Sequence, residues 1–556
     1  MINIKIICTS YLIPNNNGWS ILKNNYNLIY SDYGNTPVAL YNADTQDAVV
    51  LVIFFEDIIS IIETNKNNYK NILNILIDSI MVRCNNSNKP TLIYLGNFYN
   101  ENSIRVAKGN DQRVKIYDWF FNEIKSLTLN FKSLYFINLN QLYSDIGFDK
   151  IYDDRNWYFA HCRLSSLGIN TLSNSIFSVM NRHFTTASKV LVLDCDNTIW
   201  GGVIGEDGIN ELNLGQDGIG QTFVDFQKEI KKLIDEGLII VLSSKNNEEE
   251  VWSVFDNHPS MILQKKDIVT WRINWQEKSQ NIISIANELE LGLDTFVFWD
   301  DNPIERQKVR AILPEVYTIE PPNDVYKWPR IIRNLEKFAK FEVTVEDKSK
   351  TAQYHGRSKF VRDVSKTKNI IEYLKGIHLL PVVHNLNTIL VGRAVQLCLK
   401  TNQYNLRTIR HSAEELLKLN SINNDFTFLV SLTDDYGDHG NIALVCLEKL
   451  DEKYIFINTF LMSCRVLGRY LEVWILNEII LRAVKNKYEF IIGEYIPTNR
   501  NIVAKDLFIN YGFNKINSES LSFKNIINTN LSTNNELFIL NIKNFKIPSL
   551  EIYEKN

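Results

Sequence analysis

The chain has 556 residues, a net charge of −4 and 45% hydrophobic residues, with a mean hydropathy of −0.16. This length predicts about three domains, and the charge balance offers no basic surface for nucleic acid or an anionic membrane. The seven cysteines include no C-x-x-C pair, which argues against disulfides or a zinc site. The most apolar helix candidate, residues 470–484, is interrupted by polar side chains, and no secretory signal is visible. We therefore expect a cytoplasmic protein without a membrane span.

The first region, residues 1–187, alternates short apolar runs with polar, asparagine-rich turns. Strands are predicted at 48–55, 91–95 and 134–139, and helices at 121–130 and 164–180. This alternation is typical of an α/β sandwich.

The central region, residues 188–320, holds the most informative pattern. An apolar strand at 190–193 runs into Asp194, Cys195 and Asp196. Residues i and i+2 of a strand share a face, so both carboxylates emerge together at the carboxyl end, where ligands collect in open α/β sheets. The same alternation directs Cys195 to the opposite side.

Two further strand ends follow in chain order. The strand at 238–242 ends in Ser243 and Ser244, whose hydroxyls could bind a phosphate oxygen, and the strand at 295–299 ends in Asp300 and Asp301. Carboxylates are hard oxygen ligands suited to Mg²⁺.

Between these strands, Lys278 begins an amphipathic helix, where its ammonium group can neutralise charge shared by a phosphate and an aspartate. A carboxylate nucleophile needs a proton donor and a cation beside it. The ordered set of two aspartates, serine, lysine and two further aspartates predicts phosphoryl transfer.

This ordered set resembles the haloacid dehalogenase (HAD) superfamily of aspartate-nucleophile phosphatases. The resemblance implies that Asp194 is the nucleophile, Asp196 the general acid/base, Ser244 the phosphate-binding hydroxyl and Lys278 the neutralising cation. Thr198, Lys245 and Asn246 are expected to contact the substrate. The implied Mg²⁺ site comprises Asp194, Asp196, Asp300 and Asp301, with Asp301 favoured over Asp300 as a direct ligand.

Glycines mark the remaining features of this region. A crossover helix is predicted at 221–236, stopped by Gly237 at its C′ position. The glycine-rich segment 200–218 lies where the HAD superfamily carries its flap, and no large cap domain intervenes. An open site suits a bulky or protein-tethered substrate. A helical linker at 321–380 follows, with no chemistry assigned to it.

The last region, residues 381–556, is predicted to hold strands at 426–433, 442–447 and 454–463, followed by a helix from 471. Arg465 and Gly468 form an R-x-x-G turn between strand and helix, which presents backbone N–H groups to an anion. This turn resembles the pyrophosphate-binding turn of the GNAT acyltransferases, and Asn501 with Tyr511-Gly512-Phe513 resembles the later Asn/Tyr segment of that fold. Tyr470 stands where those enzymes usually have a second glycine.

Longer motifs are similar to the FkbH-like branch of the HAD superfamily over roughly residues 130–515. They are DNTIWGGVIGEDG (196–208), SSKNNEEEV (243–251), NWQEKSQNI (274–282), FWDDNPIER (298–306), KTNQYNLRT (400–408), DDYGDHG (434–440) and FLMSCRVLGRYLE (460–472). The resemblance implies an α/β multidomain chain with SGNH-hydrolase-like, HAD-like and GNAT-like α+β domains. The SGNH-like domain is degenerate, because no G-D-S follows its first strand and His161 lacks an aspartate three residues earlier.

Proteins of this branch load a glyceryl unit from 1,3-bisphosphoglycerate onto the phosphopantetheine thiol of an acyl carrier protein and remove its phosphate, feeding polyketide-type biosynthesis. Cys195 and Cys464 are alternative carriers of a thioester intermediate, and His439 is a candidate base for the transferring thiol. Two other functions stay open: a phosphatase for another phosphorylated metabolite, and a non-catalytic carrier-docking subunit.

Overall fold

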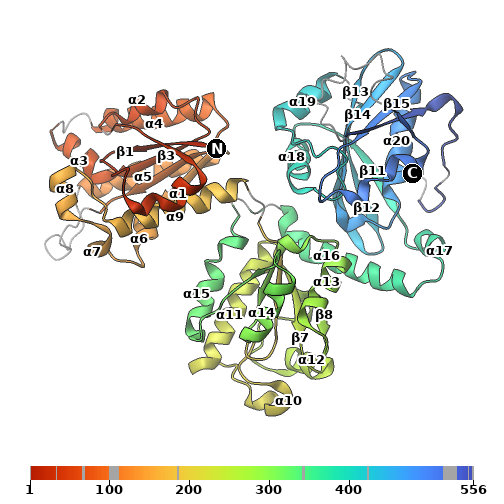
Figure 1. The fold of residues 1–556 in the computed structure, drawn as a ribbon, viewed down its shortest axis with the longest axis horizontal. Coiled ribbons are helices and arrows are strands. Elements are labelled where there is room, and N and C mark those ends of the chain that lie inside the picture. The colour runs from red at the N-terminus through yellow and green to blue at the C-terminus, as the bar shows by residue number, and fades with distance from the viewer. Residues whose placement is uncertain are drawn as a thin grey trace. The chain divides into compact units, whose positions relative to one another are not determined.

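The computed structural model describes residues 2–32, 34–64, 69–98, 112–184, 187–340, 343, 345–422, 425–516, 535–548 and 550–553 (Figure 1). The chain divides into two compact units, Met1–Thr186 and Ala187–Asn556. In the part of the chain that is described, no helix combines the length and the apolar character needed to cross a membrane.

The first unit contains a parallel five-stranded sheet in the order β2-β1-β3-β4-β5. Its strands are β1 (Asn3–Cys8), β2 (Asn27–Tyr30), β3 (Ala48–Phe54), β4 (Thr91–Gly96) and β5 (Leu134–Asn138). Its helices are α1 (Ser20–Asn25), α2 (Thr36–Tyr41), α3 (Phe55–Thr64), α4 (Tyr69–Asn86), α5 (Gln112–Asn130), α6 (Leu139–Tyr143), α7 (Phe148–Ile151), α8 (Asp154–Ala160) and α9 (Ser166–Phe184).

The two central strands of this sheet, β3 and β4, are buried along their whole length, because helices cover both faces. The sequence predicted β3, β4 and β5 but not β1 and β2. Polar residues break the apolar pattern of both, as in Asn3-Ile-Lys5.

The second unit begins with another parallel sheet, ordered β10-β9-β6-β7-β8. Its strands are β6 (Val190–Leu193), β7 (Ile239–Ser244), β8 (Ile268–Ile273), β9 (Phe296–Trp299) and β10 (Tyr317–Thr318). The helices of this part are α10 (Ile204–Asp207), α11 (Gly218–Asp235), α12 (Glu248–Asn257), α13 (Lys278–Leu289), α14 (Pro303–Ile312), α15 (Trp328–Arg333), α16 (Val345–Lys366) and α17 (Ile370–Lys375).

Two helices sandwich this second sheet. The apolar stripe of α11 packs on one face and that of α13 on the other. Packed against α11 is α15, whose Trp328 and Ile332 join the same core, so the apolar core extends into the segment read as a linker from sequence (Figure 1). Gly237, just past α11, has φ +87°, a left-handed conformation that favours glycine.

The third sheet is mixed, in the order β11-β12-β13-β14-β15-β17-β16. Its strands are β11 (Leu380–Asn385), β12 (Thr427–Asp434), β13 (Gly437–Lys449), β14 (Tyr454–Met462), β15 (Phe490–Tyr495), β16 (Asn514–Ile516) and β17 (Glu536–Asn541). Its helices are α18 (Val391–Lys400), α19 (Ala413–Ile422), α20 (Leu471–Lys485) and α21 (Leu507–Tyr511). Among the paired strands only β14 and β15 run parallel. The predicted fold class, an α/β multidomain protein, is confirmed.

Candidate active site

The carboxyl ends of β6 and β9 bring three aspartates together. Strands β6 and β9 are neighbours in register, with Leu193 opposite Trp299. Asp194 and Asp300 are the next residues on each strand and therefore share the face covered by α13. Asp301 follows, and one carboxylate oxygen from each of the three lies within 4.8 Å of the others.

Lys278, the first residue of α13, reaches this cluster from above the sheet. Its ammonium nitrogen lies 2.9 Å from Asp194 Oδ2 and 2.5 Å from Asp300 Oδ2. Burial alone would lower the pKa of Lys278, but the charges of Asp194 and Asp300 outweigh it and hold the pKa above its usual value. The lysine is therefore a permanent cation.

Three carboxylates against one lysine leave excess negative charge. Burial and the charge of Asp194 raise the pKa of Asp300 to about 7 and that of Asp301 to about 6. Asp194 Oδ1 is buried and has no hydrogen-bond partner among the described residues. An unpartnered carboxylate oxygen in an oxygen-rich cluster fits a hard divalent cation.

The two neighbouring aspartates are not equivalent. Asp300 Oδ2 is held by Lys278, and its Oδ1 accepts the backbone N–H of Asn302 at 2.9 Å. For Asp301, the structure shows no bond from another described side chain to its carboxylate. Asp301 is therefore freer to ligate a metal, in keeping with the preference drawn from sequence.

Asp196 lies outside the aspartate cluster, and its carboxylate is bound by the flap. Its Oδ1 accepts Trp200 Nε1 at 2.9 Å and the backbone N–H of Ile204 at 3.1 Å, while Oδ2 accepts Asn246 Nδ2 at 2.8 Å. Burial raises the pKa of Asp196. Asn246, predicted to contact substrate, hydrogen-bonds the predicted acid/base residue, and Trp200 is a contributor that the sequence did not single out.

The register of β7 distinguishes its two serines. Leu242 pairs with Leu193, so Ser243 is level with Asp194 and shares its face, whereas Ser244 is level with Cys195. Ser243 Oγ is buried without a partner among the described residues, and Ser244 hydrogen-bonds Cys195. Strand alternation, applied to both strands together, could have identified Ser243 from the sequence.

Cys195 is fully buried on the α11 side of the sheet, and burial raises its pKa well above the usual value. The structure therefore does not bring its thiol to the aspartates. Thr198 has a buried hydroxyl without a partner in the described part of the chain. Lys245 is paired with Glu305 at 3.0 Å and Glu277 at 3.6 Å.

The predicted residues of the third sheet form a separate group that is largely buried. His439 Nε2 lies 2.9 Å from Asp434 Oδ1, and Arg469 Nε lies 2.6 Å from Asp434 Oδ2. Arg465 donates from Nη2 to the His439 carbonyl oxygen at 2.9 Å. Since His439 is 1% exposed, these contacts give it and Arg465 structural partners rather than access to a substrate.

A cavity of about 750 Å³ opens beside the R-x-x-G turn. It is lined by Gly468 and Tyr470, both with positive φ (87° and 57°), and by the carboxylates of Glu290, Glu472 and Asp506. Its described lining contains no lysine or arginine. A phosphate placed here would meet carboxylates, so the expected contact of a phosphopantetheine phosphate gains no support from this cavity.

Cys464 is half-buried and packs between the cores of the second and third sheets. It hydrogen-bonds Tyr354 of α16. Of the two cysteines considered as acyl carriers, Cys464 is the more exposed.

The parallel strands β14 and β15 separate beyond their paired residues, and the segment around Leu406 hydrogen-bonds to the chain on both sides of the opening. The strands pair only at residues 454–456 and 490–492. Beyond them, the Leu406 N–H donates to Phe460 O, and the Ile496 N–H donates to Leu406 O. Asn501 Nδ2 donates to Asn405 O and Ile496 O, and its Oδ1 accepts the Thr498 N–H and Tyr495 hydroxyl. Asn501 is fully buried and has its hydrogen-bonding capacity used within the fold.

No family model matches the chain, and no curated protein matches it significantly. Among solved structures, the chain is similar to the N-terminal part of the protein BF1531 from Bacteroides fragilis, which contains a phosphatase domain and is complexed with Mg. The two are 25% identical with a TM-score of 0.54, over 60% of this chain and 93% of that chain.

Weaker likenesses involve acetyltransferase folds. Rv2747 from Mycobacterium tuberculosis, in complex with CoA and NLQ, is 15% identical over 29% of this chain and 98% of its own, with a TM-score of 0.24. The GNAT domain of S. lividans PAT is 14% identical over 29% of this chain and 89% of its own, with a TM-score of 0.22.

Proposed function

We propose that this protein is a Mg²⁺-dependent phosphatase coupled to acyl transfer. It takes 1,3-bisphosphoglycerate, moves the phosphoglyceryl group to the phosphopantetheine thiol of an acyl carrier protein, and removes the 3-phosphate. The observation that carries the phosphatase half is the Lys278 bridge between Asp194 and Asp300, beside an Asp194 oxygen that has no partner among the described residues. The likeness to a phosphatase domain complexed with Mg supports the same chemistry.

In this mechanism Asp194 attacks the phosphorus of the 3-phosphate and the ester oxygen leaves with a proton from Asp196. Water then attacks the aspartyl phosphate, Asp196 takes its proton, and inorganic phosphate is released. Lys278 neutralises the negative charge on the phosphoryl oxygens. Asp194 and Asp301, with Asp300 beside them, would hold a Mg²⁺ ion, which would supply further charge neutralisation.

The acyl half is a thiol exchange. A thiolate attacks the carbonyl carbon of the acyl phosphate, the C–O bond to phosphate breaks, and inorganic phosphate leaves. The thiolate belongs either to the carrier or to an enzyme cysteine that later passes the acyl group on. Its greater exposure favours Cys464 over Cys195 for the second route.

Intact-mass analysis of a holo carrier protein tests this proposal. Incubated with the protein, Mg²⁺ and 1,3-bisphosphoglycerate, the carrier should gain a glyceryl group. Asp194→Asn should instead leave it with a phosphoglyceryl group, because only the second step needs the nucleophile. Peptide mapping of the protein shows whether a cysteine carries the intermediate.

A plain phosphatase for another phosphorylated metabolite is the second candidate. It is favoured by the acidic cavity at the 465–470 turn, which offers no cation to a pantetheine phosphate. An unmodified carrier alongside phosphate released by the wild type, and not by Asp194→Asn, would establish this function instead.

A further inference from the structure

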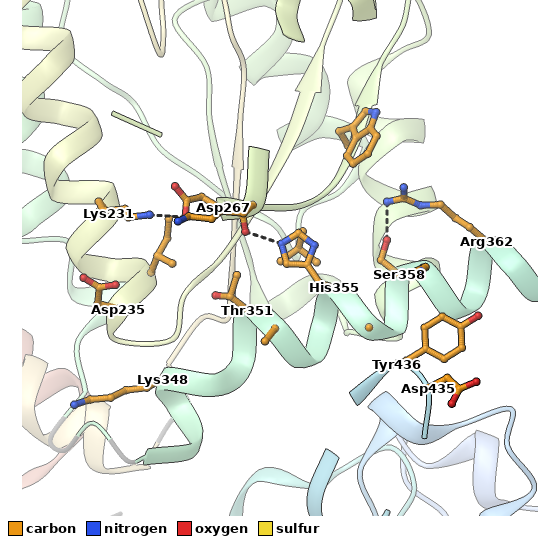
Figure 2. Close-up of a pocket in the computed structure, with 17 residues that line it drawn as sticks. Lys231, Asp235, Asp267, Lys348, Thr351, His355, Ser358, Arg362, Asp435 and Tyr436 are labelled. Carbon is orange, nitrogen blue, oxygen red and sulfur yellow. Dashed lines mark hydrogen bonds and ion pairs between the residues drawn. The ribbon is translucent and has the colours of Figure 1, made fainter. Parts of the chain in front are cut away.

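A groove of about 1,050 Å³ lies along α16, beside the edge strand β8 of the second sheet. Its walls come from the last turns of α11, the start of β8, one face of α16 and the β12–β13 turn (Figure 2). The groove starts at the amino edge of the sheet, where α11 ends, and extends along β8 to Trp271, which is level with Leu193 but lies two strands away on the face opposite Asp194. The groove is therefore a separate site.

The helix presents a repeating face to this groove. Lys348, Thr351, His355, Ser358 and Arg362 follow at spacings of three or four residues, so they lie on one side of α16 (Figure 2). From Lys348 to Arg362 the helix rises about 21 Å. An occupant that contacts both ends is an elongated molecule.

The groove carries excess positive charge. Its lining includes five lysines and arginines against three aspartates. Lys266, Lys348 and Lys359 have no carboxylate within 4.0 Å among the described residues, whereas Lys231 is already paired with Asp267. Arg362 is also paired, at 3.6 Å from Glu288. The three lysines without such a partner therefore face the carboxylates of Asp235 and Asp435 and leave a net positive charge. The uncompensated charges favour an anionic ligand.

A hydrogen-bond donor points to the same conclusion. The Thr351 hydroxyl is buried, lines the groove and has no partner among the described residues. It lies one helical turn from Lys348, whose side chain extends from the same end of the groove in another direction (Figure 2). A hydroxyl and an ammonium group can both donate to phosphate oxygens.

The other end of the groove is aromatic. Trp271 and Tyr436 line it, and the Arg362 guanidinium lies over the Trp271 ring at 4.5 Å. Arg362 is held there by Ser358 Oγ at 2.7 Å. A planar ring bound at this end would lie beside the Trp271 indole, the Tyr436 phenol and the Arg362 guanidinium, all of which can stack with it.

We propose that the α16 groove binds a nucleotide, with its phosphates at the Lys348–Thr351 end and its base at the Trp271–Tyr436 end. A nucleoside diphosphate carries negative charge at one end and a flat aromatic ring at the other, and it is long enough to reach between them. Neither the phosphatase nor the acyl-transfer chemistry uses this groove, so its test is independent of the proposed function.

The test is calorimetric titration of the full-length protein, without Mg²⁺, with ADP, pyrophosphate and adenosine. ADP should bind most tightly, since it alone fills both ends. Lys348→Met should weaken both ADP and pyrophosphate binding about tenfold, the scale of one charge-assisted hydrogen bond. Trp271→Leu should weaken ADP binding about tenfold through lost stacking and leave pyrophosphate unchanged.

Lys418→Met is the matched control, because Lys418 is an exposed lysine outside the groove. It should change none of the affinities, and Lys348→Met should keep wild-type melting and wild-type hydrolysis of a small phosphate ester. The proposal is overturned if ADP gives no saturable binding. It is equally overturned if Lys348→Met binds ADP as the wild type does while Asp194→Asn does not, since the nucleotide would then occupy the aspartate site.

Discussion

At the scale of single residues, the chemistry is concentrated in a few side chains at one edge of one sheet. Lys278 forms ion pairs with both Asp194 and Asp300. Asp196 lies outside this group, and its carboxylate accepts a hydrogen bond from Trp200 in the glycine-rich segment 200–218. Because Trp200 and Ile204 both donate to Asp196, a flap movement that breaks these bonds would free the carboxylate for proton transfer. The proposed acid/base residue is thus tied to the segment that covers the site.

The two serines at the end of β7 give the sharpest residue-level prediction. Ser243 shares a face with Asp194, while Ser244 is bonded to Cys195. Ser243→Ala should therefore lower kcat/KM for a small phosphate ester about tenfold or more, the cost of one hydrogen bond to a charged phosphate. Ser244→Ala is the matched variant, and its kcat/KM should fall less than that of Ser243→Ala. The reverse order would return the phosphate-binding role to Ser244.

Removing the metal should make stability depend on pH. The pKa values of Asp300 and Asp301 are raised from 3.8 to about 7 and about 6. Between about pH 4 and 7 the folded protein then binds more protons than the unfolded chain, so metal-free stability should fall as pH rises through this window. Melting curves in EDTA at pH 5 and 7.5 measure the fall, and Asp301→Asn should reduce it.

Mg²⁺ should reverse that loss, because it binds the ionised carboxylates. At 100 times its Kd the ion adds about 2.7 kcal/mol to the free energy of unfolding. The gain in melting temperature should be large at pH 7.5 and small at pH 5, where Asp300 and Asp301 are protonated. An equal gain at both pH values would show that the ion binds elsewhere.

At the scale of secondary-structure elements, the link from α11 to β7 depends on Gly237. Its φ is +87°, and a Cβ there would lie 2.1 Å from the Asp347 carbonyl oxygen of α16. The glycine thus ends one helix and allows a second helix to pack against the turn. The left-handed backbone and the close approach of α16 both require glycine at this position. Only the first requirement, the end of the helix, is visible in the sequence.

Gly237→Ala should therefore lower the free energy of unfolding by more than 1 kcal/mol, roughly the strain of a left-handed alanine plus a backbone clash. Gly215→Ala is the control, since no atom lies within 4 Å of its Cβ position. It should melt within a degree or two of the wild type. Chemical denaturation of both variants checks the difference, and equal stabilities would contradict the described turn.

At the scale of the whole molecule, the second unit has two centres at opposite edges of one sheet. The aspartates lie at the carboxyl edge. The cavity at the 465–470 turn includes Glu290 and Leu291, which lead from α13 back to the amino edge.

Arg465→Ala tests what the turn does. Because Arg465 donates to the His439 carbonyl from a buried position, its removal should lower the free energy of unfolding by about 1.5–3 kcal/mol. Hydrolysis of a small ester at Asp194 should persist wherever the variant is folded. An unchanged melting curve together with a ten- to hundredfold loss of carrier use would instead support binding of the pantetheine phosphate by Arg465.

The sequence by itself predicted which polar residues meet at the carboxyl edge of the second sheet. Strand periodicity and the order of Asp194, Lys278 and Asp300 predicted their convergence, because parallel strands present their carboxyl ends at one edge. It did not reveal β8, whose Ile268–Ile273 run mixes apolar residues with Thr270 and Arg272. Polar residues at alternate positions are typical of a half-buried strand, whereas the pairing of this strand with β7 at the edge of the sheet is visible only in the fold.

Tertiary structure decided the contacts made between distant segments. Arg465, His439 and Asn501 are polar residues in promising motifs, yet the fold uses them to satisfy buried carbonyl, carboxylate and amide groups. The α16 groove was equally invisible in the sequence, because its cations come from three segments that only packing brings together. Local patterns fix which face a side chain occupies. What that side chain meets across the gap depends on the packing of elements far apart in the chain.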